Sequence, residues 1–280
     1  MLACQAVDDR IEGPRSMSGP QERELEYTDD FVAVLEAMWG EGFLSPGGPE
    51  EVARIVEGVD LSGARVLDVG CGTGGCDLEL IRRHGAAEVV GIDVEPQLVA
   101  RCHDLAAAKG LADRLTFCLV EPGALPYPDG SFDVVFSKDS MIHIPDKAAL
   151  YRDVLRVLAP GGIFLGSDWL RGFEGRNSPT MERWLRSVDL TFAMATPERT
   201  RLAMEAAGFV EVEVRNRNEW FRAQSRRDLA QVEGPAKDAI REVWGADGLE
   251  RYIQRTRLRV EIVDSGELCP CHLTGRKGGA

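Results

Sequence analysis

The sequence predicts an α/β fold in which a mostly parallel sheet is joined by crossover helices. Short apolar runs alternate with amphipathic helical segments between residues 65 and 166, and this alternation is typical of βαβ units. A glycine-rich turn at residues 70–75 follows the first apolar run and opens a helix. Ligands bind at this position in open parallel sheets. The chain of 280 residues, 44% of them hydrophobic, is long enough to bury one large core.

The region before the glycine turn predicts a leader and a lid. Residues 1–24 are mostly small and polar, are interrupted by glycine and proline, and lack the basic and apolar regions of a secretory signal. We expect them to be a disordered leader. Two amphipathic helices, at residues 27–39 and 49–59, flank a loop rich in glycine and proline. These helices predict an N-terminal helical lid over residues 25–60.

The next segment, residues 61–171, is predicted to form the ligand-binding core. Asp146 is expected to cap the helix before the fifth strand, and Pro160 with the two following glycines is expected to end that helix. The apolar runs predict five strands, at residues 65–69, 88–92, 115–120, 132–137 and 163–166.

The remaining residues, 172–280, predict cap helices together with the last strands of the sheet. Helical spacing is expected at residues 181–192, at 197–207 and through a long stretch from 220 to 263. Residues 210–214 and 267–276 are expected to be strands.

Composition excludes several classes of partner. The formal charge of -13 disfavours nucleic acid, whose binding requires a basic surface, and also an anionic membrane surface. No apolar run approaches the roughly 20 residues of a membrane span. The seven cysteines are scattered, which suits reduced thiols and a cytoplasmic location. Cys269, Cys271 and His272 lack a matching pair at zinc spacing, so no metal is predicted.

The glycine turn fits two kinds of cofactor. Gly70, Gly72 and Gly75 match the dinucleotide pattern G-x-G-x-x-G, and Asp93 follows about 20 residues later. However, Asp68 ends the first strand, where its charge would repel a pyrophosphate and suit a ligand with a cationic end. The turn also begins some distance into the chain, after two helices. A nicotinamide dinucleotide is therefore the less favoured cofactor.

Three motifs together resemble the class I S-adenosylmethionine-dependent methyltransferases. They are DVGCGTG at residues 68–74, Asp93 at the end of the second strand, and LPYPDGSFD at residues 125–133. The resemblance implies a Rossmann-like, seven-stranded, mostly parallel sheet whose last strand is antiparallel, with helices on both faces and a helical cap. It implies that S-adenosylmethionine is the cofactor. It places Asp68 near the ligand's ammonium, Asp93 at the ribose and Glu121 near the adenine. The other implied cofactor contacts are Gly70, Cys71, Gly72, Gly74, Val94, Ser137 and Lys138.

A closer resemblance involves residues outside the core. YTD at residues 27–29, GEGFLSPGG at 40–48 and SKDSMIH at 137–143 are similar to the phosphoethanolamine N-methyltransferases. The resemblance implies that Tyr27 and His143 form a catalytic pair and contact the substrate. It also implies that Ser45 contacts the cofactor's carboxylate and that Asp139 lies in the acceptor pocket.

A histidine has a physical role in such a reaction. Deprotonating an alkyl amine with a pKa of about 10.4 costs roughly 4 to 5 kcal/mol at pH 7. A histidine with an ordinary pKa of about 6.5 is able to accept that proton, and a tyrosine hydroxyl is able to orient the amine. His143 and Tyr27 are the predicted catalytic residues.

The likeness fails in the cap, where the acceptor would be chosen. Arg183 and Arg186 are the basic residues expected to contact the substrate, while Leu190 and Phe192 replace polar groups. Trp169 stands where a tyrosine is usual and is a further expected substrate contact. An aromatic pocket suits a cation, and it equally suits a flat acceptor. The acceptor is therefore either an ethanolamine-type amine, methylated on nitrogen, or an α-keto acid or another natural-product intermediate, methylated on carbon. A protein that binds the cofactor without turnover is the non-enzymatic alternative.

Overall fold

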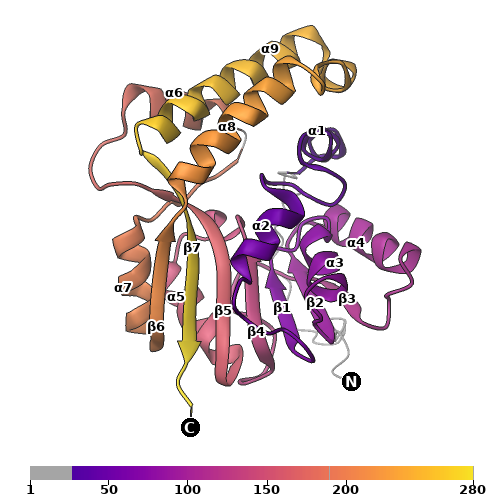
Figure 1. Ribbon diagram of the computed structural model, residues 1–280, viewed down its shortest axis with the longest axis vertical. Helices are drawn as coiled ribbons and strands as arrows, with labels where there is room; N and C mark the ends of the chain where they lie inside the picture. Colours follow the sequence, from indigo (N-terminus) through magenta and orange to yellow (C-terminus); the bar gives the residue numbers. More distant parts are fainter. Residues whose placement is uncertain (1–26, 189, 280) are drawn as a thin grey trace, which may run out of the picture.

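The central feature of the computed structural model is one seven-stranded sheet with the strand order β3-β2-β1-β4-β5-β7-β6 (Figure 1). The model describes residues 27–188 and 190–279, so the leader predicted at residues 1–24 lies outside the described part. The strands are β1 (Arg65–Val69), β2 (Glu88–Asp93), β3 (Leu115–Leu119), β4 (Phe132–Lys138), β5 (Leu158–Arg171), β6 (Phe209–Asn216) and β7 (Leu268–Lys277).

The direction of the strands agrees with the predicted fold class. The pairs β1–β2, β1–β4, β2–β3 and β4–β5 are parallel. The last strand, β7, runs antiparallel to both of its neighbours, β5 and β6. The prediction of a mostly parallel sheet with an antiparallel last strand is confirmed.

Helices cover both faces of this sheet. On one face, α2 (Gly48–Ile55), α3 (Gly75–Arg82) and α4 (Pro96–Ala108) enclose an apolar core that contains Val66, Leu80 and Phe117. On the other face, α5 (Lys147–Val157) and α7 (Pro197–Ala207) pack over Leu67 and Phe164. Side chains of successive strand residues point to opposite faces, which is why Val66 and Leu67 belong to different cores.

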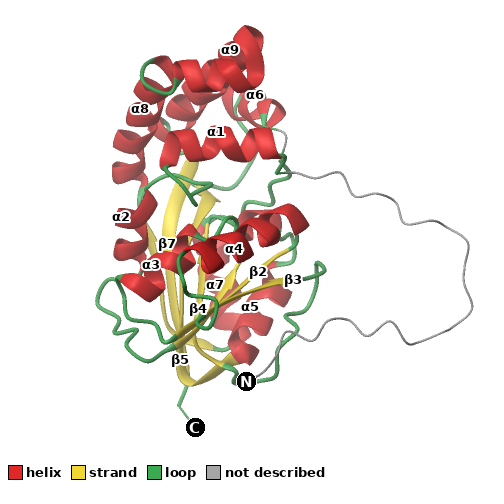
Figure 2. Ribbon diagram, turned by 90° about the vertical axis from the view of Figure 1, so that its right-hand side faces the viewer, coloured by secondary structure: helices red, strands yellow, loops and turns green. Residues whose placement is uncertain are grey.

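Four further helices form a cap beyond the carboxyl ends of the parallel strands (Figures 1 and 2). They are α1 (Asp29–Trp39), α6 (Pro179–Ser187), α8 (Asn218–Glu233) and α9 (Lys237–Asp264). Two apolar clusters join them: Val34 and Met38 of α1 pack on α8 and α9, and Trp184 of α6 packs with Phe221 and Ile262. The cap therefore covers the edge of the sheet at which the glycine loop lies.

Several expected boundaries were wrong. The helix expected at residues 49–59 ends at Ile55. The helix capped by Asp146 ends at Val157, and β5 begins at the next residue instead of after the proline and glycines, because that segment forms an irregularity in the β4–β5 ladder. The helix α6 stops at Ser187. The stretch from 220 to 263 is divided into α8 and α9, and α9 itself is interrupted at Gly245, whose φ of 71° is not helical.

Candidate active site

The glycine loop connects β1 to α3 and requires residues without side chains. Gly70, Gly72 and Gly74 have φ values of 77°, 57° and 84°, in the left-handed region that favours glycine. A Cβ atom on Gly70 would lie 2.3 Å from the Cβ of Ser140. The chain from β4 therefore packs directly on the loop, and a larger residue at position 70 would separate them.

The carboxylate of Asp93 lies beside this loop at the end of β2. Its Oδ2 accepts a hydrogen bond from the Gly72 amide at 2.9 Å, and its Oδ1 accepts from the amides of Val94 and Glu95 at 2.8 and 3.0 Å. Burial raises the pKa of Asp93, while these amides oppose the shift. The side chain is half-buried and is fixed next to the loop, in a position that suits ribose hydroxyls.

Two other residues expected at the cofactor, Glu121 and Cys71, lie on either side of Asp93. Glu121 is exposed and follows Val120, whose amide donates to the Asp93 carbonyl at 2.9 Å. Glu121 therefore lies just past the end of β3, the strand next to the one that carries Asp93. The Cys71 side chain is buried in the apolar core, and its amide donates to the carbonyl of Ile92. Cys71 therefore holds the loop against β2, and its side chain does not point to a ligand.

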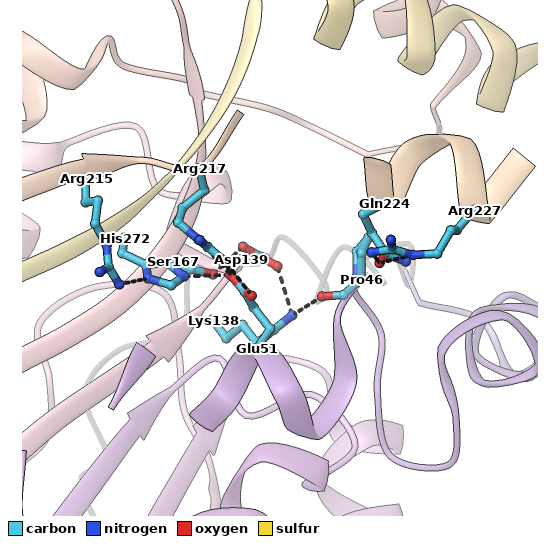
Figure 3. A network of polar contacts seen from close by, with 10 residues as sticks. All are labelled: Pro46, Glu51, Lys138, Asp139, Ser167, Arg215, Arg217, Gln224, Arg227 and His272. Carbon is cyan, nitrogen blue, oxygen red and sulfur yellow. Dashed lines mark hydrogen bonds and ion pairs between the residues drawn. The ribbon is translucent and has the colours of Figure 1, made fainter. Parts of the chain in front are cut away.

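A buried lysine joins the end of β4 to the loop between α1 and α2 (Figure 3). The Lys138 ammonium donates to Ser45 Oγ, to the Pro46 carbonyl at 3.0 Å and to Asp139 Oδ2 at 3.0 Å. Burial lowers the pKa of Lys138, but the charge and hydrogen bond of Asp139, together with Cys76 and Glu51, outweigh burial and raise the pKa. Ser137 donates to the Val69 carbonyl at 2.8 Å. Ser45, Ser137 and Lys138 thus lie together above the glycine loop.

These residues fit the cofactor that the sequence implied. Asp68 is 1% exposed, and its Oδ1 has no hydrogen-bond partner within residues 27–188 and 190–279. A buried carboxylate without a partner is costly, and a cationic ligand group would balance it. The loop carries no side chains at Gly70, Gly72 and Gly74, so a ligand is able to approach its backbone closely, and Asp93 presents a carboxylate beside it. A pyrophosphate, in contrast, would meet the negative charge of Asp68.

A pocket of about 660 Å³, including its opening to solvent, lies under the cap, and Leu44 and Ser45 of the loop between α1 and α2 form part of its wall. Its wall is mostly aromatic: Trp184 stacks on Phe192 with ring centroids 5.5 Å apart, and Trp169 lies 6.2 Å from Trp184. The remaining aromatic residues of the wall are Tyr27, Phe31, Trp39, His143 and Tyr252. This lining, mostly aromatic and apolar with a few polar groups, is typical of small-molecule sites.

His143 and Tyr27 meet in the wall of this pocket. His143 ends the short helix η1 (Met141–His143), and its Nδ1 lies 2.8 Å from the Thr191 carbonyl oxygen. Because a carbonyl only accepts hydrogen bonds, Nδ1 of the neutral ring carries the proton and Nε2 carries the lone pair. The Tyr27 ring is 6.4 Å from the imidazole at 81°. The structure brings the predicted catalytic pair together.

Asp139 lies where the aromatic pocket meets a second, smaller cavity of about 240 Å³. Its φ of 56° is uncommon for a residue other than glycine. Its Oδ1 accepts from Ser167 at 2.7 Å, and Lys138 binds its other oxygen. The second cavity includes the buried cluster of Glu51, Arg217 and His272 (Figure 3). Asp139 is thus fixed at the pocket despite its strained backbone.

The cap contributes different arginines from those expected. Arg183 and Arg186 are exposed on α6 and do not line the pocket, because the inward face of that helix carries Trp184. Arg255 and Arg259 of α9 line it instead. Sequence reasoning missed both, together with Phe31, Tyr252 and Thr256. The spacing of residues 252, 255, 256 and 259 on one helical face was the available signal.

Charges near these arginines are partly balanced inside the cap. Arg259 forms a buried ion pair with Asp228 at 2.6 Å. The Arg255 guanidinium lies 4.6 Å from the centroid of the Tyr252 ring and 5.7 Å from that of Phe31, an arrangement in which the ring faces attract a cation. The pocket therefore combines aromatic walls with basic groups on α9 and the acidic Asp139 on the opposite side.

Neither a metal cluster nor a membrane span is found in the described part of the chain. Within residues 27–188 and 190–279, no three His, Cys, Asp or Glu side chains are grouped so as to hold a metal ion. None of the described helices is long and apolar enough to cross a membrane.

The chain belongs to the methyltransferase domain family, whose model matches residues 60–218. Together with relatives at 30% identity or more, this match confirms the predicted class, an S-adenosylmethionine-dependent methyltransferase, and its cofactor. A nicotinamide dinucleotide is thereby disfavoured as the cofactor.

Particular relatives are known from sequence and structure. The chain is 30% identical to phosphoethanolamine N-methyltransferase of Triticum aestivum over 87% of this chain and 47% of that protein. It is 37% identical to 2-methyl-6-phytyl-1,4-hydroquinone methyltransferase of Synechocystis over 68% and 64% of the two chains. The solved structure of Haemonchus contortus phosphoethanolamine N-methyltransferase 2 with S-adenosyl-L-methionine superimposes with a TM-score of 0.83 at 22% identity. That match covers 91% of this chain and 58% of the other and shows the fold alone. The chain spans about half the length of the phosphoethanolamine methyltransferases it matches.

Proposed function

We propose that the protein transfers a methyl group from S-adenosylmethionine to the amine nitrogen of an ethanolamine or phosphoethanolamine type of acceptor. The observation that carries the proposal is the position of His143. Its Nδ1 is held by the Thr191 carbonyl at 2.8 Å, and it lies against Tyr27 in the wall of the pocket. The relatives named for phosphoethanolamine methylation support this choice of acceptor.

The residues of the pocket have separate tasks in this reaction. When bound, S-adenosylmethionine supplies an electrophilic methyl group on a sulfonium. His143 accepts the proton of the acceptor ammonium at Nε2 and so exposes the nitrogen lone pair. Tyr27 and Trp169 attract the cationic head group through their rings, and Asp139 contributes a negative charge beside it. The cap holds donor and acceptor in register and excludes water.

The division of the chain follows the same scheme. Residues 25–60 act as an N-terminal lid, residues 61–171 as the cofactor-binding core, and residues 172–280 as the cap together with the last strands. The lid loop is bonded to the core, since the Gly75 amide donates to the Gly42 carbonyl at 3.1 Å. A small-molecule acceptor, with no nucleic acid or membrane as partner, and a cytoplasmic location complete the proposal.

A second candidate function rests on the apolar part of the wall. Val188, Leu190 and Phe192 line the pocket, at positions where a phosphate would require polar groups. The relative from Synechocystis is named for methylation of a hydroquinone. The alternative is therefore C-methylation of an α-keto acid or another natural-product intermediate, with His143 accepting a proton from the acidic carbon.

A panel of acceptors assayed for S-adenosylhomocysteine release tests the proposal. Ethanolamine and phosphoethanolamine should give a methylated amine as product. The His143→Ala variant should lose about 10²- to 10⁴-fold in kcat, the usual contribution of a general base, while its affinity for S-adenosylhomocysteine stays unchanged. His103→Ala, on the exposed side of α4, is the matched control.

The outcomes separate the candidates. Wild-type turnover in His143→Ala would remove the proposed base. Deuterium exchange at the acidic carbon of a keto acid, with a methylated carbon as product, would replace the amine proposal by the second candidate.

A further inference from the structure

Two carboxyl groups are buried together beneath the glycine loop. Asp68 on β1 is 1% exposed, and Asp77 on α3 has no exposed surface. Asp68 Oδ1 and both carboxyl oxygens of Asp77 have no hydrogen-bond partner in the described part of the chain. Aspartate is almost never fully buried unless it is paired. A bound proton or a cation is therefore needed to balance the negative charge of this pair.

The local fold explains why Asp77 faces Asp68. Asp77 lies in the first turn of α3, which begins at Gly75 directly after the glycine loop. Leu80 and Ile81, three and four residues later, are buried on the same face of the helix. That face packs on the sheet, and Asp68 is on the strand beneath it. An acidic residue thus occupies a position where the helix would otherwise present an apolar side chain.

The surrounding charges favour retention of a proton. Burial, and then repulsion from Asp77, raise the pKa of Asp68, and burial raises the pKa of Asp77 to about 7. Asp93 on β2 adds to both shifts. Lys138 on β4 opposes the shift of Asp68, but its ammonium is already bound to three oxygens. The neighbouring thiol of Cys76 stays protonated, because burial raises its pKa. Two adjacent carboxyl groups titrate as a unit and share one proton.

We infer that Asp77 is a cofactor-positioning residue that acts through Asp68. The pair holds one proton in the cofactor-free protein and releases it to solvent when the α-ammonium of the cofactor binds beside Asp68. The inference rests on the S-adenosylmethionine dependence of the proposed function. The ligand keeps all of its protons, and no covalent bond changes apart from loss of the shared O–H.

The linked proton sets the pH dependence of cofactor affinity. Because the cofactor-free protein binds one more proton than the complex, affinity rises with pH over the range in which the pair would otherwise stay protonated. One linked proton changes the dissociation constant by at most about tenfold per pH unit. 5′-Methylthioadenosine lacks the ammonium and the carboxylate, so its affinity should not carry this slope. Because 5′-methylthioadenosine retains the adenosine group that Asp93 is proposed to bind, any titration of Asp93 affects both ligands equally and drops out of the comparison.

Calorimetry on the full chain tests the inference without any acceptor. S-Adenosylhomocysteine is titrated from about pH 5.5 to about pH 7, below the pKa of about 7.7 to 8 of an ordinary α-amino group, in two buffers of different ionisation enthalpy. We expect the affinity for S-adenosylhomocysteine to rise more steeply with pH than the affinity for 5′-methylthioadenosine, and we expect more protons to be released on binding. Asp77→Asn should reduce this excess, because the repulsion that helps Asp68 to retain a proton is removed while its burial remains. Glu79→Gln, which removes one negative charge from the same helix at its ion pair with Arg83, should retain it.

Equal slopes for the two ligands in the wild-type protein would overturn the inference, as would a wild-type slope in Asp77→Asn. The comparison of the two ligands on the wild-type protein tests the inference even if the Asp77→Asn variant does not fold. Proton-linked binding without turnover on any acceptor would contradict the proposed function alone. Turnover with equal slopes would contradict only the role of Asp77.

Discussion

Replacing Glu51 by glutamine should destabilise the junction between α2 and the C-terminal strands. Glu51 is 3% exposed, and its carboxylate binds Arg217 at 3.0 Å and His272 Nε2 at 2.6 Å. Arg215 donates to Nδ1 of the same imidazole at 3.0 Å, which fixes His272 as the tautomer with its proton on Nε2. Removing the charge of Glu51 therefore leaves Arg217 in the cluster without its counter-ion.

The expected cost follows from this burial. Breaking a buried ion pair by removing one partner costs about 3 to 5 kcal/mol. We expect the lower value, about 3 kcal/mol, because glutamine keeps an acceptor oxygen and the Arg217 side chain is 15% exposed. At about 2 to 4 °C per kcal/mol, the melting temperature should fall by roughly 6 to 12 °C.

The pH dependence has a definite sign. Burial alone would raise the pKa of Glu51, but its bonds to His272 and Arg217 outweigh burial and lower it. A carboxyl whose pKa is lower in the folded protein stabilises above its unfolded pKa and loses that contribution as pH falls through the folded value. The difference between the wild type and Glu51→Gln should therefore be constant near neutral pH and shrink below about pH 4.

Thermal and denaturant unfolding of the two proteins measure this difference. Glu50→Gln is the matched control, because Glu50 is exposed on the same first turn of α2 and contributes at most about 1 kcal/mol through the helix dipole. If Glu51→Gln melts within the range of this control, the buried cluster is not a source of stability.

Two further variants test the cofactor loop and the acceptor wall. Gly70→Ala should abolish S-adenosylhomocysteine binding in calorimetry, because the new Cβ would lie 2.3 Å from the Cβ of Ser140. Gly161→Ala is the control, because Gly161 has the same φ of 77° but no neighbour within 4 Å. Loss of binding in both variants would show that backbone strain, and not the contact with Ser140, is the cause. Trp184→Ala should lower the free energy of unfolding by about 3 to 5 kcal/mol, because Trp184 is 2% exposed and packs on Phe192. The variant should also raise the KM for the acceptor, while its affinity for S-adenosylhomocysteine stays unchanged. An unchanged acceptor KM would show that α6 does not shape the pocket.

Local sequence signals determined the core of this protein. The glycine loop, Asp93 and the cap at Asp146 were found because each depends on neighbours within a few residues: positive φ values, a strand end and a helix N-terminus. The alternation of strands and helices predicted a mostly parallel sheet, because parallel strands require crossover connections; the order of the strands came only from the structure. The pairing of Tyr27 with His143 was inferred from a resemblance, since nothing local joins residues so far apart.

Only the tertiary structure decided the pocket and the buried charges. Arg183 and Arg186 were expected at the substrate, but Trp184 has the larger apolar surface and occupies the inward face of α6. Their place is taken by Arg255 and Arg259, which α9 brings back over the pocket by packing on α1, α6 and α8. From the sequence, Asp77 is one of the acidic residues that are common in the first turn of a helix. Its burial against Asp68 depends on how α3 packs on the sheet. Sequence patterns specify helices and strands because these depend on residues close together in the chain. The face that a cap helix turns to a ligand depends instead on packing between segments that are far apart in the chain.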